Sequence, residues 1–254
     1  MRGFTVAICV LFMPGMVSSQ MLPYSELTPF YELKISALTK SIASKRKSEI
    51  HTLKQLFRRS HRKFLKSYNA YATPSDIFER GRYDCLSGTY FLSLGLDNLG
   101  IKYRMIETNY HIFLIAETSQ GEVMLESTDR FNGFITGPEK IEERISSYEN
   151  NTAGDTDQRY LSHVKIYHEI LPPQLLGLFY FNQAVAAFHK NDLVSSSRHL
   201  ESAWKIYDNL RIYEFAPILI HSILQSELDE RQKANLTAVL KQHLSRSQQT
   251  LATR

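Results

Sequence analysis

The sequence predicts an α+β fold followed by paired helices, and three stretches of the chain indicate it. Apolar residues in segment 85–99 recur at helical spacing and stop at a glycine. Segments 110–117 and 123–128 are predicted to form a hairpin, because a Gln-Gly turn separates them. After two prolines at 172–173, apolar residues again recur at helical spacing. A further strand is expected at 101–107, so the first helix would pack on at least three strands.

The first nineteen residues have the pattern of a secretory signal peptide. Arg2 precedes a mostly apolar run at 5–17, which is too short to span a bilayer comfortably, and Ser19 is a small residue suited to a cleavage site. We expect cleavage after Ser19 and export to the periplasm or the outside. The alternative, an uncleaved anchor, would need a longer apolar run. No later segment is apolar enough to cross a membrane.

Composition and cysteine usage narrow the class of protein. The chain has 254 residues, of which 43% are apolar and 22% charged, as is ordinary for a soluble globular protein of one or two domains. A net charge of +4 does not argue for nucleic acid. Cys9 would leave with the signal peptide, so Cys85 would be the single thiol of an exported protein. Such a thiol is expected to be reactive or to pair between molecules.

Segment 33–69 is predicted to form one helix, or two helices separated by a break. Its apolar stripe comprises Leu53, Leu56, Phe57, Phe64, Leu65 and Tyr68. The other face is basic and comprises Lys45, Arg46, Lys47, Lys54, Arg58, Arg59, Arg62, Lys63 and Lys66. We favour a solvated helix surface over a docking surface for an acidic polymer, anionic lipid or nucleic acid. A turn at 73–76 should lead into a short helix capped by Ser75 or Asp76.

The predicted helix at 85–99 places a thiol at its first turn. Asp84 is a suitable N-cap, because its carboxylate can accept from the free N–H groups of that turn. Cys85 then lies where the helix dipole favours a thiolate and where backbone N–H groups can bind an oxyanion. The negative charge of Asp84 opposes ionisation of the thiol. A cationic partner is therefore required.

His111 is the candidate partner, at the start of the buried strand at 110–117. Pairing of this strand with the returning strand would bring His111 close to Glu126 or its neighbours. We therefore assign Cys85 as nucleophile, His111 as base and later acid, and Glu126 as the group that orients the imidazole.

Three motifs carry a resemblance to a known family. The Asp-Cys-Leu-Ser opening, the Asn-Tyr-His-Ile-Phe strand and the Leu-Glu-Ser-Thr-Asp end resemble the core of the transglutaminase-like superfamily, and more narrowly its bacterial branch with C-terminal tetratricopeptide-like helices. The resemblance covers residues 50–135 well and the last third loosely. It implies a papain-like fold and a Cys-His-Asp triad, carried over to Cys85, His111 and Glu126. The third position is usually Asp and here is Glu, with Asp129 as the substitute.

The remaining segments complete the predicted domain organisation: a signal peptide at 1–19, a transglutaminase-like domain at 20–170 and a tetratricopeptide-like region at 171–254. A polar loop is expected at 150–158 and, from alternating apolar residues, a strand within 160–170. Leu175, Leu178, Phe179, Asn182, Ala186 and Phe188 are predicted to lie on one amphipathic helix, and Leu200, Ala203, Trp204 and Tyr207 on its partner. A second helical unit is expected at 217–244. With so few repeats, we favour a helical buttress over a free peptide-binding solenoid.

The leading function is cysteine-dependent hydrolysis or acyl transfer at an amide bond of a peptide or peptidoglycan-like substrate. Cys85, His111, His163 and His168 show no zinc-ligand spacing, so no metal or other cofactor is expected. One alternative is a non-catalytic envelope scaffold that binds a protein partner through the C-terminal helices or the basic face. Another is a redox-sensing thiol, which would be indifferent to Glu126.

Overall fold

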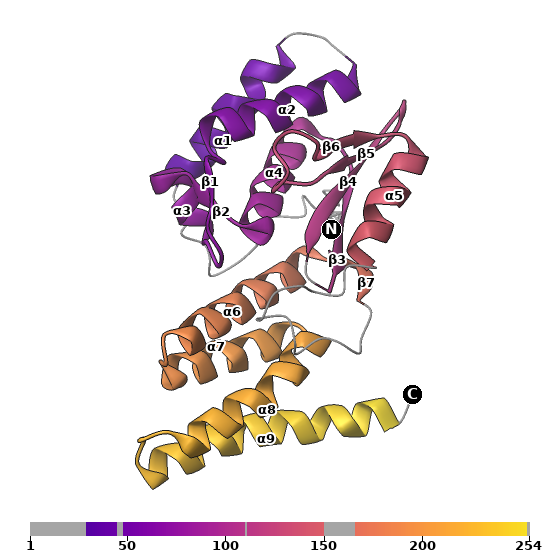
Figure 1. Ribbon diagram of the computed structural model, residues 1–254. Helices are drawn as coiled ribbons and strands as arrows, with labels where there is room; N and C mark the ends of the chain where they lie inside the picture. Colours follow the sequence, from indigo (N-terminus) through magenta and orange to yellow (C-terminus); the bar gives the residue numbers. More distant parts are fainter. Residues whose placement is uncertain (1–28, 45–47, 110, 150–165, 253–254) are drawn as a thin grey trace, which may run out of the picture.

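The computed structural model describes residues 29–44, 48–109, 111–149 and 166–252 (Figure 1). The helices are α1 (Pro29–Ala43), α2 (Glu49–Lys63), α3 (Pro74–Arg80), α4 (Cys85–Leu99), α5 (Pro138–Glu149), α6 (Pro172–His189), α7 (Leu193–Ile206), α8 (Leu210–Gln225) and α9 (Glu230–Ala252). The strands are β1 (Ser67–Tyr68), β2 (Arg82–Tyr83), β3 (Tyr103–Thr108), β4 (Ile112–Thr118), β5 (Gly121–Leu125), β6 (Phe134–Thr136) and β7 (Tyr167–Ile170). The expected signal peptide and the polar loop at 150–158 lie outside the described residues.

The fold is α+β, and its main sheet is antiparallel with strand order β6-β5-β4-β3-β7. Strand β4 is buried on both faces. Leu114 and its alternate neighbours pack in the cluster that includes α4, whereas Phe113 and Ile115 pack against Ile141 and Ile145 of α5. The period of two thus sends successive β4 side chains to opposite helices. The sheet lies between α4 and α5 (Figure 1).

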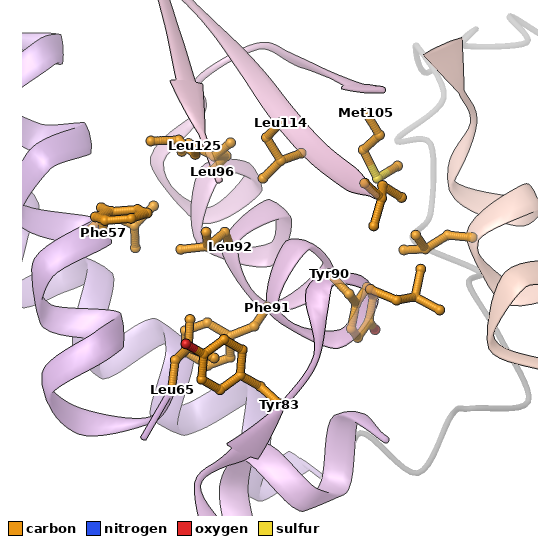
Figure 2. Close-up of a cluster of buried hydrophobic side chains, with 14 of the residues drawn as sticks. Phe57, Leu65, Tyr83, Tyr90, Phe91, Leu92, Leu96, Met105, Leu114 and Leu125 are labelled. Atoms are coloured by element: carbon orange, nitrogen blue, oxygen red, sulfur yellow. The ribbon is translucent and has the colours of Figure 1, made fainter. Parts of the chain in front are cut away.

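Helix α4 lies at the centre of the larger core. Leu92 and Leu96 are fully buried and share one cluster with Phe57 of α2 and Leu114 of β4. Figure 2 shows these side chains meeting around α4, with Leu125 of β5 beside Leu96. Burial of this apolar surface fixes α4 against the sheet.

Residues next to the helix ends determine where α3 and α4 begin and end. Gly100 ends α4 in the left-handed conformation (φ 66°), which glycine adopts without strain. The prediction that Ser75 or Asp76 is the N-cap of α3 was wrong. Thr73 is the N-cap of α3, and Asp76 is its partner three residues on, because the two form a reciprocal capping box with Pro74 in the first turn.

The segment predicted as helix at 33–69 forms α1 and α2 and then turns into β1. Leu53, Leu56, Phe57 and Leu65 are buried as expected, but Tyr68 is 61% exposed because it lies on β1, which pairs with β2. The basic side chains described as exposed are Lys54, Arg58, Arg62, Lys63 and Lys66. Arg59 is half-buried and donates to Ser41 Oγ of α1 at 2.9 Å.

Helices α6 to α9 form successive antiparallel pairs below the sheet (Figure 1). The last pair begins at Leu210, seven residues before the predicted start, and Pro217 lies inside α8. Helix α6 packs on both sides. Leu175, Leu178 and Phe179 join the cluster around α4, while Ala184 joins Trp204 and the α8 core. The main core therefore continues past residue 171. The division of the chain into two regions at 170 and 171 stays a prediction. Among the described helices, none is both long and apolar enough to span a membrane.

Candidate active site

Cys85 is the first residue of α4 and is half-buried. Asp84 precedes it as the predicted N-cap, and its Oδ1 accepts from the Ser87 backbone N–H at 2.7 Å. Ser87 Oγ in turn accepts from the Asp84 N–H at 2.9 Å, which completes a capping box. The thiol is thereby fixed at the positive end of the helix dipole, as the sequence predicted.

Burial and neighbouring hydrogen-bond donors both affect the ionisation of Asp84. Burial raises the pKa of Asp84 to about 6, although hydrogen bonds from Ser87 act in the opposite direction. Asn182 of α6 donates to Asp84 Oδ2 at 3.3 Å. The carboxylate that opposes a thiolate at Cys85 is thus partly satisfied by neighbours, and it holds a proton more readily than an exposed aspartate.

The β4–β5 hairpin brings His111 and Glu126 together. Leu114 is opposite Leu125, so Glu126 continues level with Phe113, two residues from His111 on the same side of the hairpin. Diagonal neighbours of this kind are within reach of long side chains. His111 Nε2 and Glu126 Oε1 are 2.8 Å apart, with 14% and 2% of the side chains exposed.

Asp129 takes a different partner. Its Oδ2 accepts from both terminal nitrogens of Arg144 on α5, at 3.2 and 3.3 Å. Glu126 is therefore the carboxylate that meets His111, and Asp129 is held by an ion pair away from the imidazole. Of the two carboxylates that the sequence left open, Glu126 contacts His111 and Asp129 contacts Arg144 of α5.

Cys85 lies close enough to His111 to affect the ionisation of its imidazole. Because Nε2 faces Glu126, Nδ1 is the ring nitrogen left for the thiol. Burial alone would lower the pKa of His111, but hydrogen bonds and charges of Cys85 and Glu126 raise it to about 10. Burial alone would raise the pKa of Glu126, but His111 and Thr128 lower it to about 2. Both directions favour a charged pair of His111 and Glu126.

Two further residues hold this pair, and the sequence reasoning missed them. Thr128 donates its backbone N–H and its hydroxyl to Glu126 Oε1, each at 2.7 Å. Tyr148 of α5 packs on the imidazole, with ring centroids 4.7 Å apart and planes 34° apart. Thr128 lies inside the Leu-Glu-Ser-Thr-Asp motif and could have been found there. Tyr148 had no sequence signal, because only the packing of α5 brings it to His111.

The cysteine helix and the hairpin are joined directly. Ser127 is fully buried, and its hydroxyl donates to the Cys85 carbonyl at 3.4 Å. A Cβ atom at Gly88 would lie only 2.6 Å from Ser127 Oγ, so glycine allows this close approach. Thr89 Oγ1 donates to the Ile112 carbonyl at 3.1 Å, beside His111. The three predicted site residues thus belong to one packed unit.

The other histidines considered at the outset lie elsewhere. His163 is outside the described residues, and His168 on β7 contacts Glu107 and Tyr207. Within the ranges that the structure describes, no three His, Cys, Asp or Glu side chains gather as a metal site would require.

Comparisons of the chain with protein-family models, with curated proteins and with solved structures gave no match. The likeness to the transglutaminase-like superfamily therefore rests on the three motifs alone. The function is inferred below from the geometry of Cys85, His111 and Glu126.

Proposed function

We propose that this protein is an exported cysteine hydrolase or acyltransferase that acts on an amide bond of a peptide or peptidoglycan-like substrate. The observation that carries the proposal is the buried pair of His111 and Glu126, 2.8 Å apart, with the Cys85 thiol near the imidazole at the start of α4. A thiol, an imidazole and a buried carboxylate in this order are the parts that nucleophilic catalysis by cysteine requires. The proposal includes a papain-like, transglutaminase-like core.

The chemistry follows from the positions of the three side chains. The Cys85 thiolate attacks the amide carbonyl carbon, and the developing oxyanion is stabilised by the N–H groups at the start of α4. The imidazolium of His111 gives its proton to the leaving amine as the C–N bond breaks, which leaves a thioester on Cys85. His111 then takes a proton from water or from a second amine, which attacks the thioester. The thiolate is released and the product is an acid or a new amide.

Glu126 keeps the imidazole in one orientation throughout this cycle. Its carboxylate is almost fully buried and accepts from His111 and Thr128, so it stays ionised while His111 changes its protonation state. Glutamate serves in place of aspartate because the longer arm reaches back from the end of β5. The same proposal includes two partners. One is the peptide or cell-wall amide substrate, and the other is an envelope protein that binds the C-terminal helices.

Turnover is tested by incubating the protein with a panel of peptides, amines and peptidoglycan fragments and searching by mass spectrometry for a thioester on Cys85. We expect an adduct in the wild-type protein, none in Cys85→Ser, and a strongly reduced amount in His111→Ala. Asp129→Asn is the matched carboxylate control and should keep the adduct. Alkylation of Cys85 that has the same pH dependence in the wild type and in His111→Ala would contradict the proposal and favour the scaffold alternative.

A further inference from the structure

A second carboxylate is buried on the sheet, away from the thiol. Glu107 on β3 is 0% exposed, and its partners come from β7, from the connection between α7 and α8, and from the first turn of α8. They are Tyr207 Oη at 2.6 Å, Asn209 Nδ2 at 3.0 Å, Arg211 Nε at 3.2 Å and His168 Nε2 at 3.4 Å. Burial alone would raise the pKa of Glu107, but the Arg211 charge and the hydrogen bonds from His168, Tyr207 and Asn209 lower it. The carboxylate is thus kept as an anion that fixes the Arg211 guanidinium.

The Arg211 guanidinium extends from this cluster toward the histidine. A terminal nitrogen of Arg211 donates to the Thr108 carbonyl, while its Nε faces Glu107. Thr108 in turn binds the His111 carbonyl twice, through its backbone N–H at 2.8 Å and its hydroxyl at 3.2 Å. Arg211 on α8 is therefore connected to the backbone of His111 through one residue, Thr108.

This connection reaches His111 through the end of the sheet. The pairing of β3 with β4 runs from Tyr103 opposite Ala116 to Glu107 opposite Ile112, and the bond from the Thr108 N–H to the His111 carbonyl continues the same register by one pair. On the other side, Thr89 of α4 holds the Ile112 carbonyl at 3.1 Å. The backbone beside the imidazole is thus held by α4 at Ile112, and Arg211 adds a contact to the Thr108 carbonyl that sheet pairing alone does not supply.

We propose that Arg211 is a positioning residue for His111, by which the C-terminal helices set the geometry of the cysteine–histidine pair. The inference rests on the proposed function, because it assigns the helices a role in that same site. A misplacement of the imidazole by a fraction of an ångström weakens its interaction with Cys85, and reactivity depends steeply on such geometry. The helical region then acts as part of the catalytic unit and not only as a buttress.

The test is the pH dependence of Cys85 alkylation in the full chain, followed by mass spectrometry of the Cys85 peptide so that Cys9 does not interfere. In Arg211→Gln, we expect the midpoint of alkylation to rise from its wild-type value toward that of a free thiol, about 8.5. The control is Leu219→Ala, which removes buried side-chain atoms from α8 without touching Thr108. Asp84 and Tyr68, which also face Cys85, are unchanged in both variants.

The outcomes separate the two proposals. A raised midpoint in Arg211→Gln, with a wild-type midpoint in Leu219→Ala at an equal loss of melting temperature, supports the positioning role. A wild-type midpoint in Arg211→Gln overturns it and leaves the proposed function standing. A midpoint near the free-thiol value in the wild-type protein itself overturns both. If Arg211→Gln does not fold, Arg211→Lys decides in the same way, because lysine keeps a positive charge beside Glu107 but lacks the guanidinium fork that contacts both Glu107 and Thr108, and an unchanged midpoint there is equally contradictory.

Discussion

Glu126 and Asp129 lie three residues apart, yet only one of them meets the histidine. Glu126 follows the last paired residue of β5 and is buried beside His111, whereas Asp129 lies in the following loop and pairs with Arg144. The longer glutamate side chain suits the diagonal position in the hairpin. Residue identity and strand register together therefore determine which carboxylate contacts the imidazole.

The ion pair between His111 and Glu126 makes stability depend on pH in a defined window. Glu126 has its pKa lowered from 4.5 to about 2, so its contribution is present above 4.5 and is lost as pH falls toward 2. His111 has its pKa raised from 6.5 to about 10, so its contribution is present below 6.5 and is lost as pH rises toward 10. In Glu126→Gln, the loss of unfolding free energy should be largest between pH 4.5 and pH 6.5, and smaller at lower and at higher pH.

Urea unfolding of the wild type and Glu126→Gln across this pH range measures the difference. Asp129→Asn is the control, because Asp129 pairs with Arg144 and takes no part in the His111–Glu126 pair. A stability difference for Glu126→Gln that does not vary with pH would show that the pair is not charged in the folded protein.

At the scale of elements, the distance between α4 and the hairpin is set by Gly88. An alanine there would place its Cβ 2.6 Å from Ser127 Oγ and 2.8 Å from Ser127 Cβ. We expect Gly88→Ala to lower the free energy of unfolding by roughly 1–3 kcal/mol, because overpacking forces the elements apart.

Gly95→Ala is the matched control on the same helix. Its Cβ would meet the end of the flexible Leu56 side chain at 2.8 Å, whereas the Cβ at Gly88 would meet the short Ser127 side chain. Alanine gains about 1 kcal/mol of helix propensity over glycine at both positions, so the difference between them reports the close contact alone. The loss at Gly95 should therefore be clearly smaller than at Gly88 in urea unfolding. Equal losses would mean that Ser127 yields as readily as Leu56 does.

The elements that the sequence predicted well are those whose signals are local. Asp84 and Gly100 mark the ends of α4 because caps depend on neighbouring residues. The cap of α3 was wrong because Thr73, Ser75 and Asp76 are all good caps within one turn. The pairing of β7 with β3 joins distant segments, and no local pattern could specify it.

The same distinction between local signals and long-range packing applies to the candidate site. Cys85, His111 and Glu126 were predicted from motifs and hairpin geometry, and the structure brings them together. The choice of Glu126 over Asp129 depended on Arg144, and the cover over the imidazole depended on Tyr148. Both come from α5, whose docking on the sheet cannot be derived from residue spacing.

At the scale of the whole molecule, the C-terminal helices share a buried polar centre with the sheet. Tyr207, Asn209 and Arg211 all reach Glu107 on β3, and Gly177 on α6 leaves only 2.4 Å between an added Cβ and Tyr207 Cβ. The helices therefore dock through matched polar and close-packed contacts. This agrees with the expectation of a buttress and not with a free solenoid.

Removing the central carboxylate should destabilise the whole chain. Glu107→Ala leaves Arg211 without its buried partner, and breaking such a pair costs roughly 3–5 kcal/mol. Glu117→Ala on β4 is the control, because Glu117 is exposed and such surface changes stay within about 0.5 kcal/mol. Thermal unfolding measures both. A single lowered transition for Glu107→Ala is expected, and a loss no larger than that of Glu117→Ala would show that the cluster adds nothing to the docking.

The central claim is that His111 carries a proton between the Cys85 thiolate and Glu126, and an NMR titration of the His111 imidazole measures it most directly. We predict a pKa well above the ordinary 6.5 in the wild-type protein and a lower value in Cys85→Ser, because the thiolate is one of the groups that raise it. Titration near 6.5 in both proteins would contradict the account, since His111 would then have neither anionic partner.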